Sequence, residues 1–387
     1  MCDVVVVVLL QVQVSRTTTT ITGIRIRMSA LEFAKHLHRR PYHLVKNNKI
    51  LKALVMKLKT TLQKAKDMKR AGSLFQKITS LENLILADGK AQKGKSKQYG
   101  VIAHNKNKER NIASLNDILI SKTYKTSNYS VFKVYEPKER EVYKLPYFPD
   151  RICHHAIMNI LEPIFLNVFT ADSYSCIKGK GIHAASFNLR KALKNEEETT
   201  FCLKLDIKKF YPNVDHDILK SLLRRKFKDQ DLLWLLDEII DSSPGLPIGN
   251  YLSQYFANFY LTYFDHWIKE RLKAKYYFRY ADDIVILNRD KEVLHRILYL
   301  IKSYFEINLK LQVKENWQVF PVKVRGIDFV GYKHFHSHTL LRKSIKKRFA
   351  RMLKTNPKSE SIASYKGWTK HCNSKNLLKK LIPHETL

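Results

Sequence analysis

The chain has 387 residues, 44% of them hydrophobic and 11% aromatic, which is enough for two or three domains with real cores. Its 70 Lys and Arg residues against 35 Asp and Glu residues give a formal charge of +35. Such a charge repels itself without a polyanionic partner, and it favours nucleic acid over an anionic membrane. The five cysteines form no Cys-x-x-Cys pair, which argues against a zinc ribbon and fits a reducing, cytoplasmic setting. No apolar run reaches the roughly 18 residues of a membrane span.

The first 27 residues are expected to lie outside the fold. Val4–Leu10 is too short for a membrane span and follows Asp3, and a threonine run at 17–20 is low in complexity. We hypothesise that translation starts at Met28. Mass spectrometry of the natural protein tests this, and a native N-terminus at Met1 would refute it.

From Met28 to Thr123 the sequence is rich in lysine and mostly helical in pattern. Ile50–Ala65 carries apolar residues at spacings of three and four, whereas Tyr99–Asn107 is predicted to be a loop. This region is either a solvated basic face or a surface for RNA phosphates, and the residues alone leave both interpretations open.

Residues 131–151 are predicted to form a hairpin, with Lys138 and Arg140 near its turn. Arginine on such a hairpin could hold a triphosphate, since its guanidinium matches phosphate bidentately. Arg151–Val168 and His183–Lys194 follow as predicted helices.

Phe201–Ile207 alternates apolar and polar residues, as a half-buried strand does. The alternation places Asp206 near the strand end, on the face opposite Leu203 and Leu205. Alone, Asp206 would be a surface residue that ends a strand.

A turn at residues 242–250 precedes a long helix with an aromatic stripe, and Asp290–Leu309 is a further predicted helix. Between them, residues 278–287 predict a hairpin with Asp282 and Asp283 at its tip. Phe329–Tyr332 predicts another tight hairpin, and the chain from Lys333 is basic and predicted to be helical.

Asp206 and Asp282 are 282 − 206 = 76 residues apart, each beside a strand-like run. If their strands are neighbours, the carboxylates can bind two Mg²⁺ ions about 4 Å apart, which is the arrangement of two-metal phosphoryl transfer.

The order of these motifs resembles a reverse transcriptase over about residues 130–340. Lys138–Arg151 and Ser173–Ala184 resemble the first two fingers motifs. Leu205–Tyr211 resembles the motif of the first catalytic Asp, Tyr280–Asp283 the Tyr-x-Asp-Asp box, and Phe329–Tyr332 the primer grip.

The resemblance implies a catalytic and metal-binding function for the residues at the two carboxylate motifs, namely Asp206, Asp282, Asp283 and the carbonyl of Ile207. Two Mg²⁺ ions are the implied cofactors, with Mn²⁺ as a substitute. Phe329, Val330, Gly331 and Tyr332 would contact the primer. Lys314 would donate a proton to pyrophosphate.

The resemblance also implies a nucleotide-binding set. Tyr211 would exclude a ribose 2′-hydroxyl, and the amides of Lys209 and Phe210 would face the triphosphate. The remaining members are Lys138, Arg140, Ile248, Gly249 and Gln254.

Leu246–Gln254 distinguishes the subtype, because its Ile248-Gly249 and Ser253-Gln254 replace the usual Gln-Gly and Ser-Pro. This form resembles the enzymes of bacterial and phage diversity-generating retroelements. It implies error-prone cDNA synthesis at template adenines. The implied partners are template RNA, a cDNA or primer strand, dNTPs and a small basic accessory variability protein, with no membrane.

The implied fold is an α+β right-hand polymerase with fingers, a palm with an antiparallel sheet and a helical thumb. We expect the following division: 28–157 fingers and N-terminal region, 158–217 first part of the palm, 218–248 fingers insertion, 249–332 second part of the palm with the primer grip, and 333–387 thumb. The alternatives are a retron, group II intron-like or phage-defence reverse transcriptase. Readings from other classes are a non-catalytic RNA-binding protein, which the full carboxylate set disfavours, and a basic structural protein, which the ordered motifs disfavour.

Overall fold

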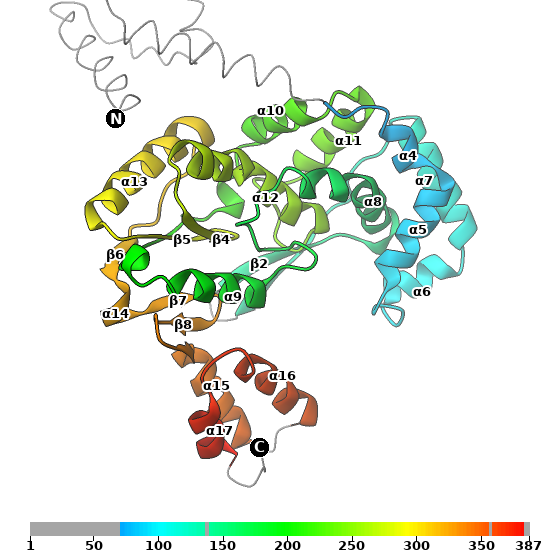
Figure 1. Ribbon diagram of the computed structural model, residues 1–387. Helices are drawn as coiled ribbons and strands as arrows, with labels where there is room; N and C mark the ends of the chain where they lie inside the picture. Colours follow the sequence, from blue (N-terminus) through cyan, green and yellow to red (C-terminus); the bar gives the residue numbers. More distant parts are fainter. Residues whose placement is uncertain (1–69, 136–138, 356–357, 383–387) are drawn as a thin grey trace, which may run out of the picture. The chain divides into compact units, whose positions relative to one another are not determined.

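The computed structural model of the chain describes residues 70–135, 139–355 and 358–382 (Figure 1). The predictions for residues 1–27, for Ile50–Ala65 and for Lys138 therefore lie outside the described residues. Among those that it describes, no helix is long and apolar enough to cross a membrane.

The helices and strands before the central sheet are α4 Phe75–Thr79, α5 Leu81–Gln92, α6 Tyr99–Asn105, α7 Lys108–Ile120, β1 Ser130–Tyr135, β2 Glu139–Lys144, α8 Ile152–Leu166 and α9 Ile182–Leu193. From the sheet onward they are β3 Phe201–Asp206, α10 His216–Lys226, α11 Gln230–Ile240, α12 Tyr251–His266, β4 Tyr276–Tyr280, β5 Asp283–Asn288, α13 Lys291–Tyr304, β6 Gln318–Pro321, α14 Val322–Arg325, β7 Ile327–Phe329, β8 Tyr332–His334, β9 Thr339–Leu341, α15 Lys343–Leu353, α16 Ser359–Thr369 and α17 Lys375–Leu381.

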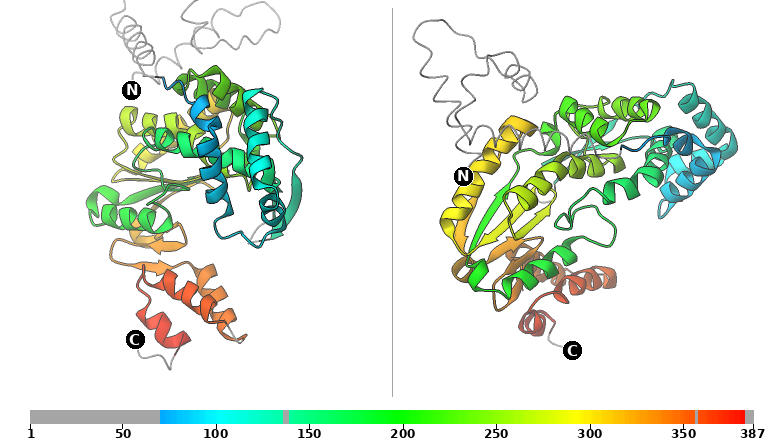
Figure 2. Two further views of the ribbon diagram at one scale, coloured as in Figure 1. Left: turned by 90° about the vertical axis from the view of Figure 1, so that its right-hand side faces the viewer. Right: turned by 45° about the horizontal axis from the view of Figure 1, so that its top comes forward.

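A four-stranded antiparallel sheet in the order β4-β5-β3-β6 lies at the centre of the described chain. Leu203 and Leu205 of β3 are buried on one face, and Cys202 is buried on the other, as the alternation predicts. α12 and α13 cover the first face and α9 the second (Figures 1 and 2). β3 therefore runs between two cores, and its position fixes where Asp206 emerges.

The helices are formed by local signals and by burial. Side chains of Ser80, Asp215, Asp229 and Asp290 cap α5, α10, α11 and α13 by accepting a backbone N–H of the first turn. α12 is apolar on nearly all sides and is buried on nearly all sides, as expected for a helix inside a core.

The three predicted hairpins are present as β1–β2, β4–β5 and β7–β8. In the last, Val330 and Gly331 form a two-residue turn in which both have positive φ, 43° and 89°, the geometry that matches the twist of antiparallel strands. The predicted helices at 151–168, 183–194 and 290–309 are also present, the last one ending in a π-helical turn, Phe305–Leu309.

Two local predictions are wrong. Tyr99–Asn105 is the helix α6 rather than a loop, because Val101 and His104 are buried, and His104 packs against Tyr147. The C-terminal segment is helical only from Lys343, because β8 pairs with β9 before α15 begins.

Candidate active site

The end of β3 and the turn between β4 and β5 bring the predicted carboxylates together. Asp206 lies opposite Asp283 in the sheet, and Tyr280 also pairs with Asp283. Ala281 and Asp282 are thus the two residues of the turn, with Ala281 at φ 54°, a conformation uncommon outside glycine. The Ile207 amide donates to the Asp282 carbonyl at 3.2 Å. The backbone itself joins the two carboxylate motifs, which are far apart in sequence.

Asp206 and Asp282 affect each other electrostatically. Burial, and then the neighbouring Asp206 charge, raise the pKa of Asp282 to about 6. Lys314 also belongs to this cluster, because its amide donates to the Asp206 carbonyl at 2.8 Å. Its Nζ lies 3.6 Å from Asp206 Oδ2. The cluster therefore holds a carboxylate pair whose mutual repulsion an added cation would relieve.

Asp283 has a different environment from Asp282. Its Oδ2 accepts a hydrogen bond from Lys204 Nζ at 3.2 Å, and its Oδ1 is buried without a partner. Burial raises the pKa of Asp283, while the Lys204 charge opposes that rise. Lys204 also donates to the Asp328 carbonyl, and Asp328 in turn pairs with Arg342. Asp283 is thus part of a chain of two ion pairs, joined by the hydrogen bond from Lys204 to the Asp328 carbonyl, that leads to the start of α15.

Asp206 and Asp282 supply a donor set that fits Mg²⁺, with Asp283 beside them. The described residues contain no group of three or more His, Cys, Asp or Glu side chains arranged to hold a metal ion. Mg²⁺ is commonly bound by one or two carboxylates, with waters and substrate phosphates completing its coordination. Asp206 and Asp282 meet that requirement, with the Ile207 backbone between them.

The predicted nucleotide-binding residues after Asp206 lie beside this cluster. Lys209 is exposed with φ 44°, Phe210 is buried in the core, and Tyr211 begins a short 3₁₀ turn. Burial raises the pKa of Tyr211, and the nearby Asp282 charge raises it further. Gly245 at φ 60° packs against this turn: a Cβ there would lie 2.6 Å from the carbonyl oxygen of Tyr211.

The predicted primer grip divides into a buried part and a part that faces a cavity. Phe329 and Tyr332 are fully buried. Val330 and Gly331 line a cavity of about 740 Å³ together with Tyr280, Asp283, Arg342 and the α16 residue Trp368. The Val330–Gly331 turn therefore opens toward the β4–β5 turn and the C-terminal helices.

The predicted residues around Ile248 form a separate group. The Ile248 carbonyl accepts from the Tyr143 amide of β2 at 2.7 Å. Gly249 and Gln254 line a pocket of about 450 Å³, together with Arg151 and His155 of the α8 region. Arg140 is exposed on β2, and within the described residues no hydrogen bond or ion pair joins it to the carboxylates.

The motifs did not reveal three residues that the structure adds to the site. Lys204 lies two residues before Asp206 on the same strand face, so the alternation was its signal. Arg279 and Asp265 form a fully buried ion pair, with Nη2 and Oδ2 2.6 Å apart. In the sequence this pair could have been recognised as an arginine within an apolar strand and an aspartate within an aromatic helix, because both residues are rarely buried unless they are paired.

A family model described as reverse transcriptase (RNA-dependent DNA polymerase) matches residues 136–334, just over half of the chain. The chain belongs to this family. The match supports RNA-directed DNA polymerase activity, and it contains Asp206, the Tyr280–Asp283 turn and the β7–β8 hairpin.

Among its curated relatives is protein YkfC of Escherichia coli (strain K12), 24% identical over 277 residues, covering 59% of this chain and 71% of YkfC. The group II intron-encoded protein LtrA of Lactococcus lactis subsp. cremoris is 27% identical over 143 residues, covering 34% of this chain and only 23% of LtrA. A solved structure of apo telomerase from Candida tropicalis overlaps with a TM-score of 0.42 at 12% identity, covering 55% of this chain and 48% of that one.

The fold prediction is confirmed. This reverse transcriptase is an α+β right-hand polymerase with an antiparallel palm sheet, helical fingers carrying the β1–β2 hairpin and a helical thumb.

Proposed function

We propose that this reverse transcriptase copies template RNA into cDNA by two-metal nucleotidyl transfer at Asp206 and Asp282. The observation that carries the proposal is the proximity of these carboxylates where β3 meets the β4–β5 turn: the Ile207 amide donates to the Asp282 carbonyl, and burial together with the Asp206 charge raises the pKa of Asp282. Mg²⁺ ions, or Mn²⁺ in their place, would lower the pKa of a primer 3′-hydroxyl and neutralise charge on a triphosphate. Asp206, Asp282 and the Ile207 carbonyl would hold them.

The other residues of the cluster would bind and orient the substrates. Tyr211 would lie under the sugar of the incoming dNTP and exclude a 2′-hydroxyl, while the amides of Lys209 and Phe210 would face its phosphates. Lys314, already beside Asp206, would supply a proton to the leaving pyrophosphate. Lys138 and Arg140 would reach the triphosphate from the fingers hairpin, and Gly331 with its neighbours would hold the primer.

We further propose the diversity-generating subtype, in which copying is inaccurate at template adenines. The support is chemical: Ile248 offers an incoming nucleotide only apolar contact, where most reverse transcriptases carry glutamine. One lost polar contact weakens selection by about 1 kcal/mol, a several-fold effect on discrimination. In this proposal a basic accessory protein and a structured template RNA are the partners. The four cysteines within the described residues are free thiols, which is consistent with a reducing bacterial cytoplasm.

Group II intron-like reverse transcription is a second candidate, favoured by the similarity to LtrA. The two differ in their errors: an intron-like enzyme would misincorporate at similar rates opposite all four template bases. We keep the predicted division into fingers at 28–157 and 218–248, palm at 158–217 and 249–332, and thumb at 333–387 as part of this proposal.

Primer extension on an RNA template tests the activity. Asp282→Asn is expected to abolish synthesis, and Asp217→Asn is the matched control because Asp217 is an exposed carboxylate on α10. Persistent synthesis by Asp282→Asn would refute the proposed centre.

Sequencing of the cDNA tests the subtype. Ile248→Gln is expected to lower misincorporation opposite adenine several-fold, while Ile248→Leu, which stays apolar, should leave it unchanged. Equal error rates in wild type and Ile248→Gln would refute this role of Ile248.

A further inference from the structure

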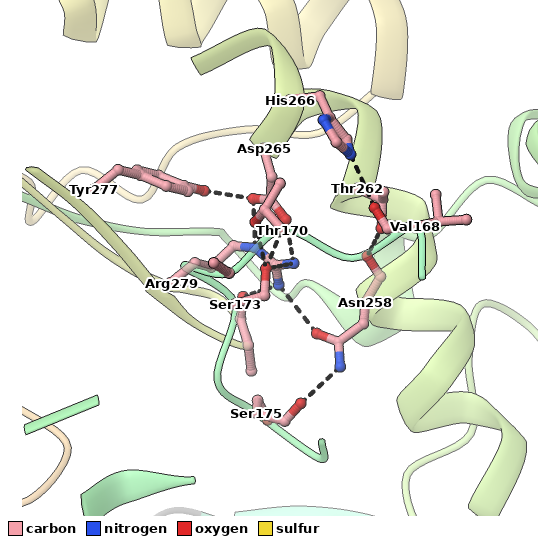
Figure 3. A network of polar contacts seen from close by, with 12 residues as sticks. Val168, Thr170, Ser173, Ser175, Asn258, Thr262, Asp265, His266, Tyr277 and Arg279 are labelled. Atoms are coloured by element: carbon pink, nitrogen blue, oxygen red, sulfur yellow. Dashed lines mark hydrogen bonds and ion pairs between the residues drawn. The ribbon is translucent and has the colours of Figure 1, made fainter. Parts of the chain in front are cut away.

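Arg279 is fully buried in β4, three residues before Asp282. Its guanidinium has five N–H donors, and each has an acceptor; Figure 3 shows those on Asp265, Ser173 and Asn258. Nε and Nη2 donate to the two carboxylate oxygens of Asp265 on α12 at 2.7 and 2.6 Å, and Nη2 also donates to Ser173 Oγ at 2.9 Å. A fork held in this way has one orientation.

The acceptor side of the pair is equally constrained. Asp265 Oδ1 accepts from the Tyr277 hydroxyl at 2.6 Å, and Asp265 Oδ2 accepts from Ser173 Oγ at 2.8 Å (Figure 3). A buried ion pair is stable only when its remaining hydrogen-bonding capacity is satisfied, and this pair meets that condition. It therefore forms a rigid support between α12 and β4.

The remaining nitrogen of the fork reaches the catalytic turn. Arg279 Nη1 donates to the Ala281 carbonyl at 3.1 Å. Ala281 has φ 54° and immediately precedes Asp282. Because an alanine at positive φ costs free energy, the turn needs an outside contact to stay in one conformation. The Arg279 hydrogen bond is such a contact, and it acts on the peptide that leads into Asp282.

We propose that Arg279 is a positioning residue for the metal centre: by fixing the Ala281 carbonyl, it sets where the Asp282 carboxylate stands relative to Asp206. The same Nη1 donates to Asn258 Oδ1 at 3.2 Å. Asn258 lies one helical turn after Gln254 on α12, so the support also links the helix of the nucleotide-selecting segment to the catalytic turn. This inference rests on the proposed function, in which Asp206 and Asp282 hold the metal ions.

Arg279→Lys tests the proposal, because lysine keeps the charge but cannot form the fork. Mn²⁺ binding to the full chain, titrated by electron paramagnetic resonance without substrates, is the readout besides activity. We expect the Mn²⁺ dissociation constant to rise at least ~5-fold and kcat to fall by about 10-fold or more, since small misplacements of reacting groups have large effects on rate. The KM for dNTP should change less than kcat, because Arg279 donates to none of the proposed dNTP contacts at Lys209, Phe210 and Tyr211.

Tyr277→Phe is the matched control. It removes a hydrogen bond to the same Asp265 and is equally buried, but Tyr277 donates nothing to the turn. It is expected to lower the melting temperature while leaving Mn²⁺ affinity and kcat near those of wild type. If Arg279→Lys does not fold, Asn258→Ala is the second test of the proposal. It removes the hydrogen bond between Arg279 Nη1 and Asn258 Oδ1 and leaves the ion pair with Asp265 intact. A rise in the Mn²⁺ dissociation constant is again expected.

Unchanged Mn²⁺ affinity and kcat in folded Arg279→Lys, or in Asn258→Ala if it is needed, would overturn the inference. Equal losses in Tyr277→Phe would also overturn it, because the effect would then be general destabilisation. A wild-type chain that neither binds Mn²⁺ nor extends a primer would instead refute the proposed function, so the two failures are distinguishable.

Discussion

Asp282 and Asp283 are neighbours in the chain, but their contacts predict opposite responses to Mg²⁺. Asp282 shares its environment with Asp206, whereas Asp283 is paired with Lys204. Asp282→Asn should therefore abolish stabilisation by Mg²⁺, and Asp283→Asn should retain it. In the absence of Mg²⁺, Asp282→Asn should be more stable than wild type, because it removes repulsion with Asp206.

The expected sizes follow from these contacts. The Lys204–Asp283 bond is 3.2 Å long, and the side chains are 25% and 28% exposed. A hydrogen bond to a charged group contributes about 1.5–3 kcal/mol when buried, and partial exposure reduces this to about 1–2 kcal/mol. Mg²⁺ at ten times its dissociation constant should add about 1.4 kcal/mol to wild-type stability.

Thermal unfolding in EDTA and in Mg²⁺ measures both effects. Wild type, the two single Asn variants, Lys204→Met and the double variant Lys204→Met/Asp283→Asn form the set. The double variant should lose about 1 kcal/mol less than the sum of its single variants, as expected for residues in direct contact.

Loss of the Mg²⁺ effect in Asp283→Asn, equal to that in Asp282→Asn, would show that both residues hold metal and would refute this reasoning. Strict additivity of Lys204→Met and Asp283→Asn would show that their contact contributes nothing.

Three further variants test other parts of the site. Gly331→Ala should shorten the products made in one binding event while single-nucleotide addition persists, because Gly331 has φ 89° and an added Cβ would clash with the Trp368 ring, 2.8 Å from Cη2 and closer still to Cζ3; unchanged product lengths would contradict this. Gly249→Ala should raise the KM for dNTP several-fold with kcat largely kept, since its Cβ would lie 2.6 Å from the Tyr143 carbonyl oxygen and would push the Leu246–Gln254 segment away from β2. Burial, followed by the charge of nearby cations, lowers the pKa of His155 to about 4. Its contribution to stability is therefore present above the unfolded pKa of about 6.5 and is lost as the pH falls toward 4, and His155→Phe should reduce that acid loss by about 1–2 kcal/mol after allowance for partial exposure. Urea unfolding across this pH range checks it, and identical pH dependence in the variant would count against it.

The sequence determined the elements whose signals are local. The alternation from Phe201 to Ile207 predicted a strand with its two faces correctly assigned, and the runs around Asp282 and Gly331 predicted hairpins that are present. These signals are readable because side-chain direction in a strand has a period of two and tight turns require particular residues. The order of the motifs was sufficient to predict the family and the α+β fold.

Local sequence pattern was insufficient to predict structure at positions where contacts with distant parts of the chain determine the conformation. Tyr99–Asn105 has little helical signal, and it is helical because Val101 and His104 meet a distant surface. In the same way, the different surroundings of Asp282 and Asp283 are invisible in an Ala-Asp-Asp sequence. It depends on Lys204, 79 positions away along the chain.

The sequence by itself thus determined which carboxylates this reverse transcriptase carries and that two of them would meet at the end of a strand. Only the tertiary structure decided that burial and the Asp206 charge raise the pKa of Asp282, that Lys204 pairs with Asp283, and that Arg279, itself paired with Asp265, donates to the turn before Asp282. The physical reason is that a charge buried in a core is stable only when partners from other elements satisfy it. The identity of those partners is a property of the packed molecule and not of any segment.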